Sequence, residues 1–321
     1  MSEYLIFIHG VNTREDRDQP DYADRLMRRI QDLSPSTTTL KPVPLYWGDV
    51  NIVTEQALLR DLRDASVWSE LAFQEFRARQ LLQFIGDGAL YISRVVGKLV
   101  VESLIEQVMK GLRDFNLETD HIHLISHSMG TIILFDMLFS SRWDAANTGG
   151  YQGVEQLRDM IFYRGSPVRS IHTMGSPLSL FSLTMLSNGP VPNTHDVTTR
   201  LGQYLKGLCS TVQSVPWRNY LHPMDVVASP IERLLPNMLN IDDSCLDVKD
   251  ILTQDPGLLS RVSDTVLDLI GTDKLRENAE ALRLVLLAGP AHSSYWTSPV
   301  VASTIIQAIE VVARMPQLQN V

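Results

Sequence analysis

The sequence predicts an α/β fold with a mostly parallel central sheet flanked by helices. Two observations carry this prediction. Short continuous apolar runs, such as 4–8 and 121–126, are typical of strands buried on both faces, as in parallel sheets. Segments with apolar residues at helical spacing alternate with these runs along the chain, which is the order expected of βαβ units. The 44% hydrophobic content is enough for a large core.

The first predicted unit is strand, helix, strand. The strand at 4–8 ends in His9-Gly10, a helix is expected over 22–33, and Pro35 breaks the helical pattern. A second strand is expected within 41–50. These three elements predict one βαβ unit at the start of the sheet.

Further strands are expected to end near Ser126, Gly175 and Asp225. The segment 129–141 is apolar all round, which indicates a buried helix. Ser298-Pro299 is a good helix start, so a closing helix is expected from there to about Arg314.

Two segments depart from the alternation, and both are predicted to be helical insertions in a single domain covering 1–321. The first, 51–113, is an insertion or a cap, split near 86–88, with a stripe of Val101, Leu104, Ile105, Val108 and Leu112. The second covers 231–283, with Leu259, Val262, Val266 and Leu269 on one face and a stop at Gly271. Whether the first segment forms a lid or continues the helical layer stays open.

The net charge, the cysteines and the first residues indicate which partners and which location to expect. A net charge of −9 argues against a nucleic-acid partner. The two cysteines, Cys209 and Cys245, are expected to be reduced. The first ten residues lack a basic region and a long apolar run, and no stretch of 18 uncharged apolar residues occurs, so a cytoplasmic location is the default expectation. Charges interrupt the apolar segment 81–109, and transient contact with a membrane surface stays open there.

The stretch LISHSMGT (124–131) follows a predicted strand and precedes a predicted helix. This is the small-x-Ser-x-Gly pattern of a nucleophile elbow, in which the positions two before and two after the serine must be small. Ser128 has Ser126 and Gly130 at those positions, whereas Ser126 has the bulky Leu124 before it. The pattern therefore predicts Ser128 as the nucleophile and Ser126 as a small spacer.

A serine nucleophile needs a base, an orienting acid and donors for the developing oxyanion. Asp225 lies just past a strand and His292 lies on a loop before the last helix, which gives the chain order serine, acid, histidine. The N–H of Met129, at the start of the helix, and the N–H of Val11, after Gly10, are the predicted oxyanion donors.

Other polar residues near these strand ends are expected to support the site. His9 and His127 lie beside the predicted oxyanion donors and more reasonably shape the site than act as base. His222 is too close to Asp225 along the chain, and the alternative acids Asp196, Asp242 and Asp243 do not follow a clean strand end. His121 and His123 share a strand face, but a metal site there would need further ligands, so no metal is expected.

Together these residues resemble the α/β-hydrolases of the lipase and esterase kind. The resemblance rests on His9-Gly10 after the first strand, on 126–130 at the elbow, on the segment 217–228 carrying the acid, and on 291–296 carrying the histidine. It covers four motifs in the right order across 4–315. It implies Ser128, Asp225 and His292 as catalytic triad, and Val11 and Met129 as oxyanion hole.

The sequence therefore predicts a serine hydrolase that cleaves a carboxylic ester through an acyl-enzyme and needs no cofactor. The apolar first insertion favours a lipid or other hydrophobic acyl substrate as its small-molecule partner. Two alternatives stay open: a catalytically silent scaffold that binds a ligand or a partner protein, and acyl transfer to an alcohol or amine. The sequence does not specify the oligomeric state.

Overall fold

The computed structural model describes residues 1–11, 13, 17–50, 52–71, 74, 91, 94–144, 152–162, 168–181, 194, 196–210, 214–242, 246–254 and 289–313. The predicted lid split near 86–88, the helix face at 259–269 and its stop at Gly271 lie outside this part of the chain.

The described chain forms a six-stranded sheet in which every pairing is parallel. The strands are β1 (Ser2–Ile8), β2 (Thr39–Leu45), β3 (His121–His127), β4 (Val168–Met174), β5 (Pro216–Leu221) and β6 (Asp247–Leu252). Their order is β2-β1-β3-β4-β5-β6. The α/β class with a parallel sheet is therefore confirmed.

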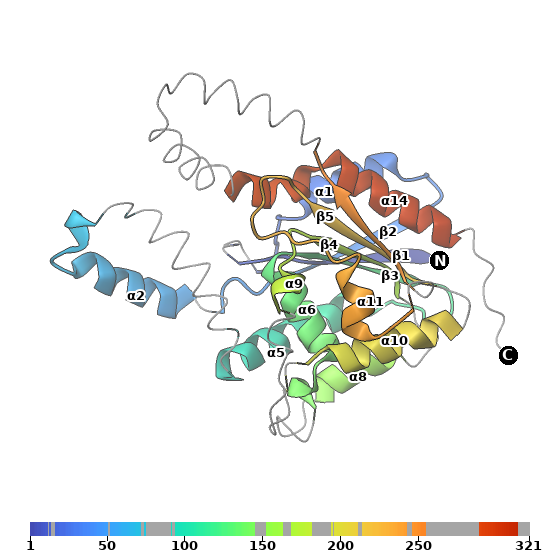
Figure 1. Cartoon of the computed structure of the whole chain (residues 1–321), viewed down its shortest axis with the longest axis horizontal. Coiled ribbons are helices and arrows are strands. Elements are labelled where there is room, and N and C mark those ends of the chain that lie inside the picture. Colours follow the sequence, from blue (N-terminus) through green and yellow to red (C-terminus); the bar gives the residue numbers. More distant parts are fainter. Residues whose placement is uncertain are drawn as a thin grey trace.

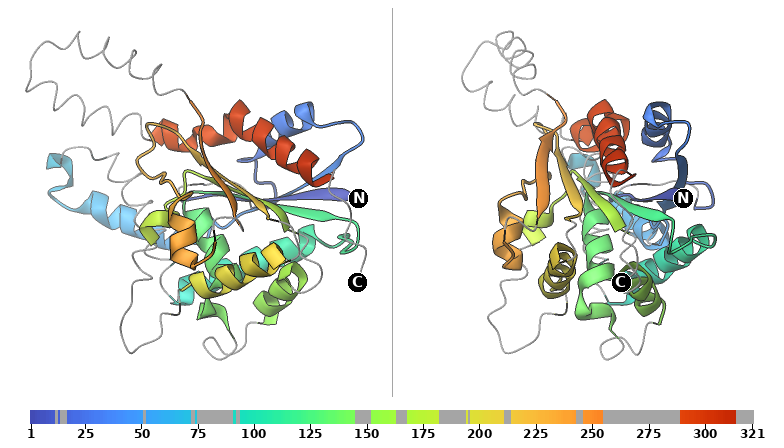
Figure 2. Two further views of the ribbon diagram at one scale, coloured as in Figure 1. Left: turned by 45° about the vertical axis from the view of Figure 1, so that its right-hand side comes forward. Right: turned by 90° about the vertical axis from the view of Figure 1, so that its right-hand side faces the viewer.

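Helices cover both faces of this sheet (Figures 1 and 2). On one face lie α1 (Asp24–Leu33) and α14 (Pro299–Ala313). On the other lie α5 (Arg94–Gly111), α6 (Met129–Phe139), α8 (Gln152–Phe162), α10 (Thr198–Ser210) and α11 (Leu234–Leu239). The remaining helical pieces are α2 (Ile52–Asp64), α9 (Leu178–Phe181), η1 (Trp68–Glu70), η3 (Ser141–Trp143) and η6 (Ser294–Thr297).

Alternation along each strand builds two separate cores. In β1, Leu5 and Phe7 pack with α1 and α14, whereas Tyr4, Ile6 and Ile8 pack with α5 and α6 on the other face. Successive side chains of a strand point to opposite faces, and a strand in the middle of a covered sheet is apolar on both. The continuous apolar run of β1 is thus explained by its place between β2 and β3.

The buried helix predicted after the elbow is present, since all eleven residues of α6 are buried. The five predicted stripe residues, four in α5 and Leu112 just after it, are buried as well, and they belong to the larger core. The closing helix begins at Pro299, and the Ser298 hydroxyl accepts a bond from the Val301 N–H at 3.4 Å. These elements follow from apolar periodicity and capping residues that the sequence shows directly.

Two expectations need correction. Residues 247–252 lie in the segment expected to be a helical insertion, yet they form β6, the strand at one edge of the sheet. Cys209, in α10, is disulfide-bonded, so the expectation of a reduced thiol is wrong there. Disulfides are uncommon in the cytosol, and the cytoplasmic location stays a prediction.

In the part of the chain that the structure describes, no helix is both long and apolar enough to cross a membrane.

Candidate active site

The strand order indicates where in the sheet a ligand site is expected. The chain runs from β1 outward to β2 and then returns to β3 on the other side of β1. In an open parallel sheet, ligands bind beyond the carboxyl ends of the strands where the order reverses in this way. Gly10 follows β1 and Ser128 follows β3, so both lie at this point of the sheet.

Ser128 occupies a strained turn between β3 and α6. Its φ of 52° and ψ of −130° are values that a residue with a side chain rarely adopts. The turn is held because the Ser128 N–H donates to the Met174 carbonyl (2.9 Å) and the Thr131 N–H donates to the Ser128 carbonyl (3.0 Å). The strain is thus maintained by neighbouring strand β4 and by the first turn of α6.

Two glycines let the backbone close around this turn. A Cβ on Gly10 would lie 2.6 Å from Ser128 Cβ, and a Cβ on Gly130 would lie 2.3 Å from the His9 carbonyl oxygen. No side chain can be accommodated at such distances from backbone or from a buried Cβ. Gly10 and Gly130 therefore bring the end of β1 against the start of α6, with the Gly10–Val11 peptide beside Ser128.

Ser126 is placed differently from Ser128. Its hydroxyl accepts a hydrogen bond from the Thr131 hydroxyl at 3.0 Å and approaches the His172 carbonyl at 3.4 Å. The residue is 1% exposed, inside the sheet layer. Its small side chain fills the space under the elbow.

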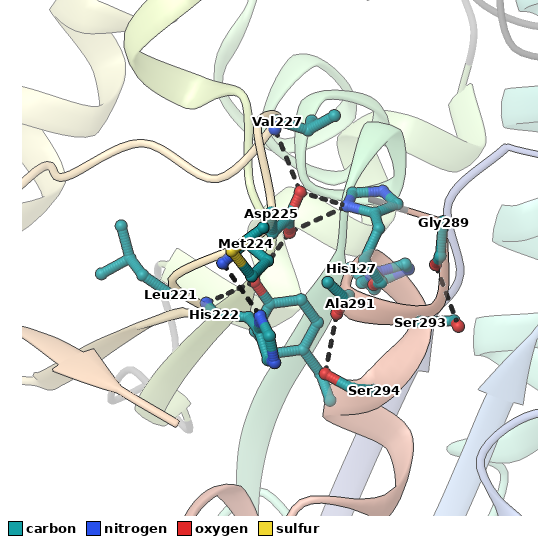
Figure 3. Close-up of polar contacts among 12 residues, drawn as sticks. His127, Leu221, His222, Met224, Asp225, Val227, Gly289, Ala291, Ser293 and Ser294 are labelled. Carbon is teal, nitrogen blue, oxygen red and sulfur yellow. Dashed lines mark hydrogen bonds and ion pairs between the residues drawn. The ribbon is translucent and has the colours of Figure 1, made fainter. Parts of the chain in front are cut away.

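Asp225, which follows β5, contacts His292, which lies in the helical residues just before η6. The His292 Nδ1–H donates to both carboxylate oxygens of Asp225, at 3.0 and 2.9 Å. The Asp225 side chain is fully buried, while 18% of the His292 side chain is exposed. The Val227 N–H and the Tyr295 hydroxyl also donate to Asp225, at 3.0 and 2.7 Å (Figure 3).

These donors decide the charge of the carboxylate. Burial alone would raise the pKa of Asp225, but the hydrogen bond and charge of His292 and the hydrogen bonds from Tyr295 and Val227 lower it below its ordinary value. Asp225 is therefore ionised at neutral pH. Its negative charge fixes the proton of His292 on Nδ1, which leaves Nε2 as a lone-pair acceptor.

The Nε2 atom of His292 is buried and has no hydrogen-bond partner in the described chain. A hydrogen bond to the Ser128 hydroxyl is thus not formed in this structure. Such bonds are often long without substrate and tighten in the complex. An unpartnered imidazole nitrogen on a ring that is paired with an ionised carboxylate is the arrangement that a general base requires.

His127 supports the backbone of the His292 segment. Its Nε2–H donates to the His292 carbonyl at 2.6 Å, and the two rings lie 4.7 Å apart. Burial, together with the neighbouring His292, lowers the pKa of His127 to about 3. His127 is therefore neutral at physiological pH and, as a hydrogen-bond donor, holds the helical turn that carries His292, which the sequence had placed in a loop.

The oxyanion donors predicted at Val11 and Met129 remain available. In the described part of the chain, neither the Val11 N–H nor the Met129 N–H donates a hydrogen bond. Met129 begins α6, where the helix dipole and unpaired N–H groups favour negative charge. The two groups come from the elements that meet at Ser128.

Two residues have roles that the sequence did not indicate. Gly175 follows β4 at a φ of +55°, and a Cβ there would lie 2.8 Å from Asp225 Oδ2 and 3.2 Å from His292 Cε1. A glycine at a strand end was its only signal. The Tyr295 hydroxyl donates to Asp225 (2.7 Å) and accepts from the His222 N–H (2.8 Å).

The alternative residues lie elsewhere. Asp196 accepts from the Thr198 N–H (2.8 Å) at the start of α10, so it caps a helix. His121 and His123 both contact Glu3, at 3.1 and 2.9 Å. Within the described residues, no three His, Cys, Asp or Glu side chains are grouped as a metal site requires.

A parallel sheet in this strand order, with a strained serine between β3 and α6 and a histidine–carboxylate pair formed by residues after β5 and before α14, is the arrangement of one known fold. The chain has the α/β-hydrolase fold. In this fold a turn such as the one at Ser128 is the position of a nucleophile elbow.

Known proteins similar to this chain include a curated sequence and a solved structure. The chain is 25% identical over 181 residues to a probable mitochondrial phospholipase of Saccharomyces cerevisiae. The aligned residues cover 52% of this chain and 24% of the yeast protein. The match thus spans about a quarter of the yeast protein's length. A dienelactone hydrolase from Anabaena variabilis matches 83% of each chain, with 12% identity and a TM-score of 0.32. No model of a protein family matches the chain.

Proposed function

We propose that this α/β-hydrolase cleaves a carboxylic ester through an acyl-enzyme formed on Ser128. One observation carries the proposal: Ser128 is strained at the turn, while the partly buried His292 pairs with ionised Asp225 and its buried Nε2 has no hydrogen-bond partner. A turn serine without chemistry needs neither the strain nor an oriented base. Ser128 is the proposed nucleophile, His292 the base and Asp225 the orienting acid.

In the first half of the reaction, the Ser128 oxygen attacks the carbonyl carbon and its proton passes to His292 Nε2. The carbonyl electron pair moves to the oxygen, where the N–H groups of Val11 and Met129 hold it. Each such donor contributes roughly 3 kcal/mol in comparable enzymes. When the carbonyl re-forms, the ester bond breaks and the leaving alcohol takes the proton from His292.

In the second half, water takes the place of the alcohol. His292 Nε2 accepts a proton from the attacking water, and a second tetrahedral intermediate forms. When it collapses, the bond between the acyl carbon and Ser128 Oγ breaks, His292 gives its proton to that oxygen, and the free acid leaves. Asp225 stays ionised throughout and stabilises the imidazolium. None of these steps requires a cofactor.

The proposed substrate class is a lipid or another ester with a hydrophobic acyl chain. It is supported by the similarity to a probable phospholipase of yeast and by the apolar residues of the segment 51–113. Transient contact with a membrane surface follows from such a substrate. A panel of p-nitrophenyl esters of increasing chain length, with phospholipid vesicles beside it, tests this class: kcat/KM should rise with chain length, and a preference for acetate would contradict it.

The proposed chemistry is tested by comparing Ser128 with Ser126, which lies two residues earlier and has no proposed part in the reaction. Ser128→Ala should reduce kcat on p-nitrophenyl butyrate by roughly 10⁶, to background, because the nucleophile is lost. Ser126→Ala should keep most of the activity, since the Ser126 hydroxyl bonds only to Thr131 and to the His172 carbonyl and takes no part in the proposed chemistry. The reverse result would contradict the choice of nucleophile.

Two outcomes distinguish the alternatives. If folded wild-type protein neither turns over any ester nor reacts with a fluorophosphonate, the chain is a silent scaffold that binds a ligand or partner. If added alcohols or amines capture the acyl group in preference to water, the reaction is acyl transfer.

A further inference from the structure

His9 is a buried histidine outside the proposed triad, and its ring is tightly packed. It follows β1, is 1% exposed, and lies among three aromatic rings. The Trp47 ring stacks on it at 5.4 Å, and the rings of Tyr46 and Tyr22 lie 5.0 and 5.1 Å away. The imidazole is therefore held in one orientation.

Both ring nitrogens of His9 have partners that fix its protonation. Nδ1 lies 2.6 Å from the Gly10 carbonyl oxygen, which can only accept, so Nδ1 carries the proton. The Trp47 backbone N–H, which can only donate, lies 3.1 Å from Nε2, so Nε2 is unprotonated. His9 is thus a neutral imidazole of a single tautomer, and its hydrogen on Nδ1 holds the Gly10 carbonyl.

The Gly10 carbonyl and the Val11 N–H belong to one peptide group. The described chain contains no cis peptide bond, so the two point in opposite directions from a rigid plane. Fixing the carbonyl therefore fixes the N–H. This peptide adjoins the nucleophile, because a Cβ on Gly10 would lie 3.1 Å from the Ser128 Oγ.

We infer that His9 is a positioning residue of the oxyanion hole. By holding the Gly10 carbonyl, it directs the Val11 N–H away from the aromatic cluster and toward the carbonyl oxygen of a substrate attacked by Ser128. Gly10 alone would leave this peptide free to rotate, since glycine has the fewest backbone restrictions. In this role His9 acts through the Gly10–Val11 peptide. The inference rests on the proposed ester hydrolysis.

Three variants separate the two hydrogen bonds of the ring. His9→Asn keeps an N–H donor at the position of Nδ1 and loses the acceptor for Trp47. His9→Gln keeps an acceptor near the position of Nε2 and loses the donor to Gly10. His9→Phe loses both and keeps the stacking on Trp47. Thermal unfolding of each variant shows which of them folds.

The readouts are kcat and KM on p-nitrophenyl butyrate and the inhibition constant of n-butylboronic acid. The boronic acid forms a tetrahedral adduct with a serine whose oxygen occupies the oxyanion position. His9→Gln and His9→Phe should lower kcat by roughly 10- to 100-fold and weaken boronate binding by a similar factor, with KM little changed. His9→Asn should stay within about threefold of wild type, since the oxyanion donor keeps its direction.

Equal losses in His9→Asn and His9→Gln would overturn the inference, because they would indicate a packing role alone. Unchanged kcat in folded His9→Gln would overturn it as well. Both outcomes leave the proposed function standing when wild type is active. If wild type neither hydrolyses the ester nor reacts with a fluorophosphonate, the proposed function itself fails and the inference fails with it.

Discussion

The residues around Asp225 keep its carboxylate ionised, so replacing Asp225 by a neutral residue should lower kcat. The carboxylate is fully buried, accepts from His292, Tyr295 and Val227, and is ionised because its pKa lies below the ordinary value. Asp225→Asn removes the charge and permits the wrong tautomer of His292, so kcat should fall by about 10⁴. Steady-state kinetics on p-nitrophenyl butyrate measure it. A loss below tenfold in a folded variant would assign the acid role elsewhere.

Tyr295 offers a milder test of the same carboxylate. Tyr295→Phe keeps the ring and removes the hydroxyl, which leaves the Asp225 charge in place but leaves the His222 N–H without its partner. We expect a stability loss of about 1–3 kcal/mol, measured by urea unfolding. We expect kcat to fall roughly tenfold, as one hydrogen bond to a charged group is lost. A loss as large as that of Asp225→Asn would contradict this account.

Single site residues can be predicted from the sequence where the chemistry restricts both the residue and its neighbours along the chain. The small residues around Ser128 and the chain order of Ser128, Asp225 and His292 are visible in the sequence, and the structure brings Asp225 and His292 into contact. The contacts of Tyr295 with Asp225 and of His9 with Trp47 join segments 70 and 38 residues apart. No local pattern encodes such pairs, so the sequence alone cannot specify them.

At the element scale, the junction of β1 with α6 depends on Gly130. A Cβ there would lie 2.3 Å from the His9 carbonyl oxygen, a backbone atom that cannot move aside alone. Gly130→Ala should therefore destabilise the fold by at least about 1–3 kcal/mol and disturb the elbow. The matched control is Gly207→Ala in α10, where a Cβ meets nothing within 4 Å and helix propensity predicts a gain of about 0.5–1 kcal/mol. Urea unfolding compares the two, and equal stabilities would contradict the close approach.

A buried polar chain joins four strands on the α1 and α14 side of the sheet. Glu3 contacts His123 (2.9 Å), His123 contacts Ser170 (2.6 Å), Ser170 contacts His172 (2.8 Å), and His172 contacts Tyr220 (2.8 Å). Every link has one donor and one acceptor when both histidines are neutral and Glu3 is ionised. A further proton on either ring would meet a group that is itself a donor.

The pKa values of this chain predict loss of stability in acid. Burial lowers the pKa of His123 and of His172, so both are neutral when folded, whereas the unfolded chain protonates them below about 6.5. Burial would raise the pKa of Glu3, but hydrogen bonds from His121 and His123 lower it to about 2. Stability is present above about pH 6.5 and falls as the pH drops, since the unfolded state then binds more protons. Urea unfolding near pH 7 and pH 5 measures this, and equal stabilities would contradict it.

Strand β6 was not predicted, because the apolar pattern of the sequence does not mark it as a strand. Its residues DVKDIL are half-exposed because the strand lies at one edge of the sheet and packs on few neighbours. Edge strands do not require the apolar run that revealed β1 and β3. The helical pattern that follows in the sequence therefore dominated the prediction for 231–283.

On the scale of the whole molecule, the order β2-β1-β3-β4-β5-β6 turns separate loops into one site. Parallel strands end at the same edge, so the loops after β1, β3 and β5 gather there. Alternation of strands and helices made this class predictable from the sequence. The strand order was not, since it depends on which strands each helix crosses and not on local pattern.

The central claim is that Ser128, oriented at this edge, attacks an acyl carbon. The most direct measurement is intact-protein and peptide mass spectrometry after reaction with a fluorophosphonate. We predict one adduct on wild-type protein, mapped to Ser128, abolished in Ser128→Ala and retained in Ser126→Ala. Absence of an adduct on folded wild type, or an adduct that maps to another residue, would contradict the account.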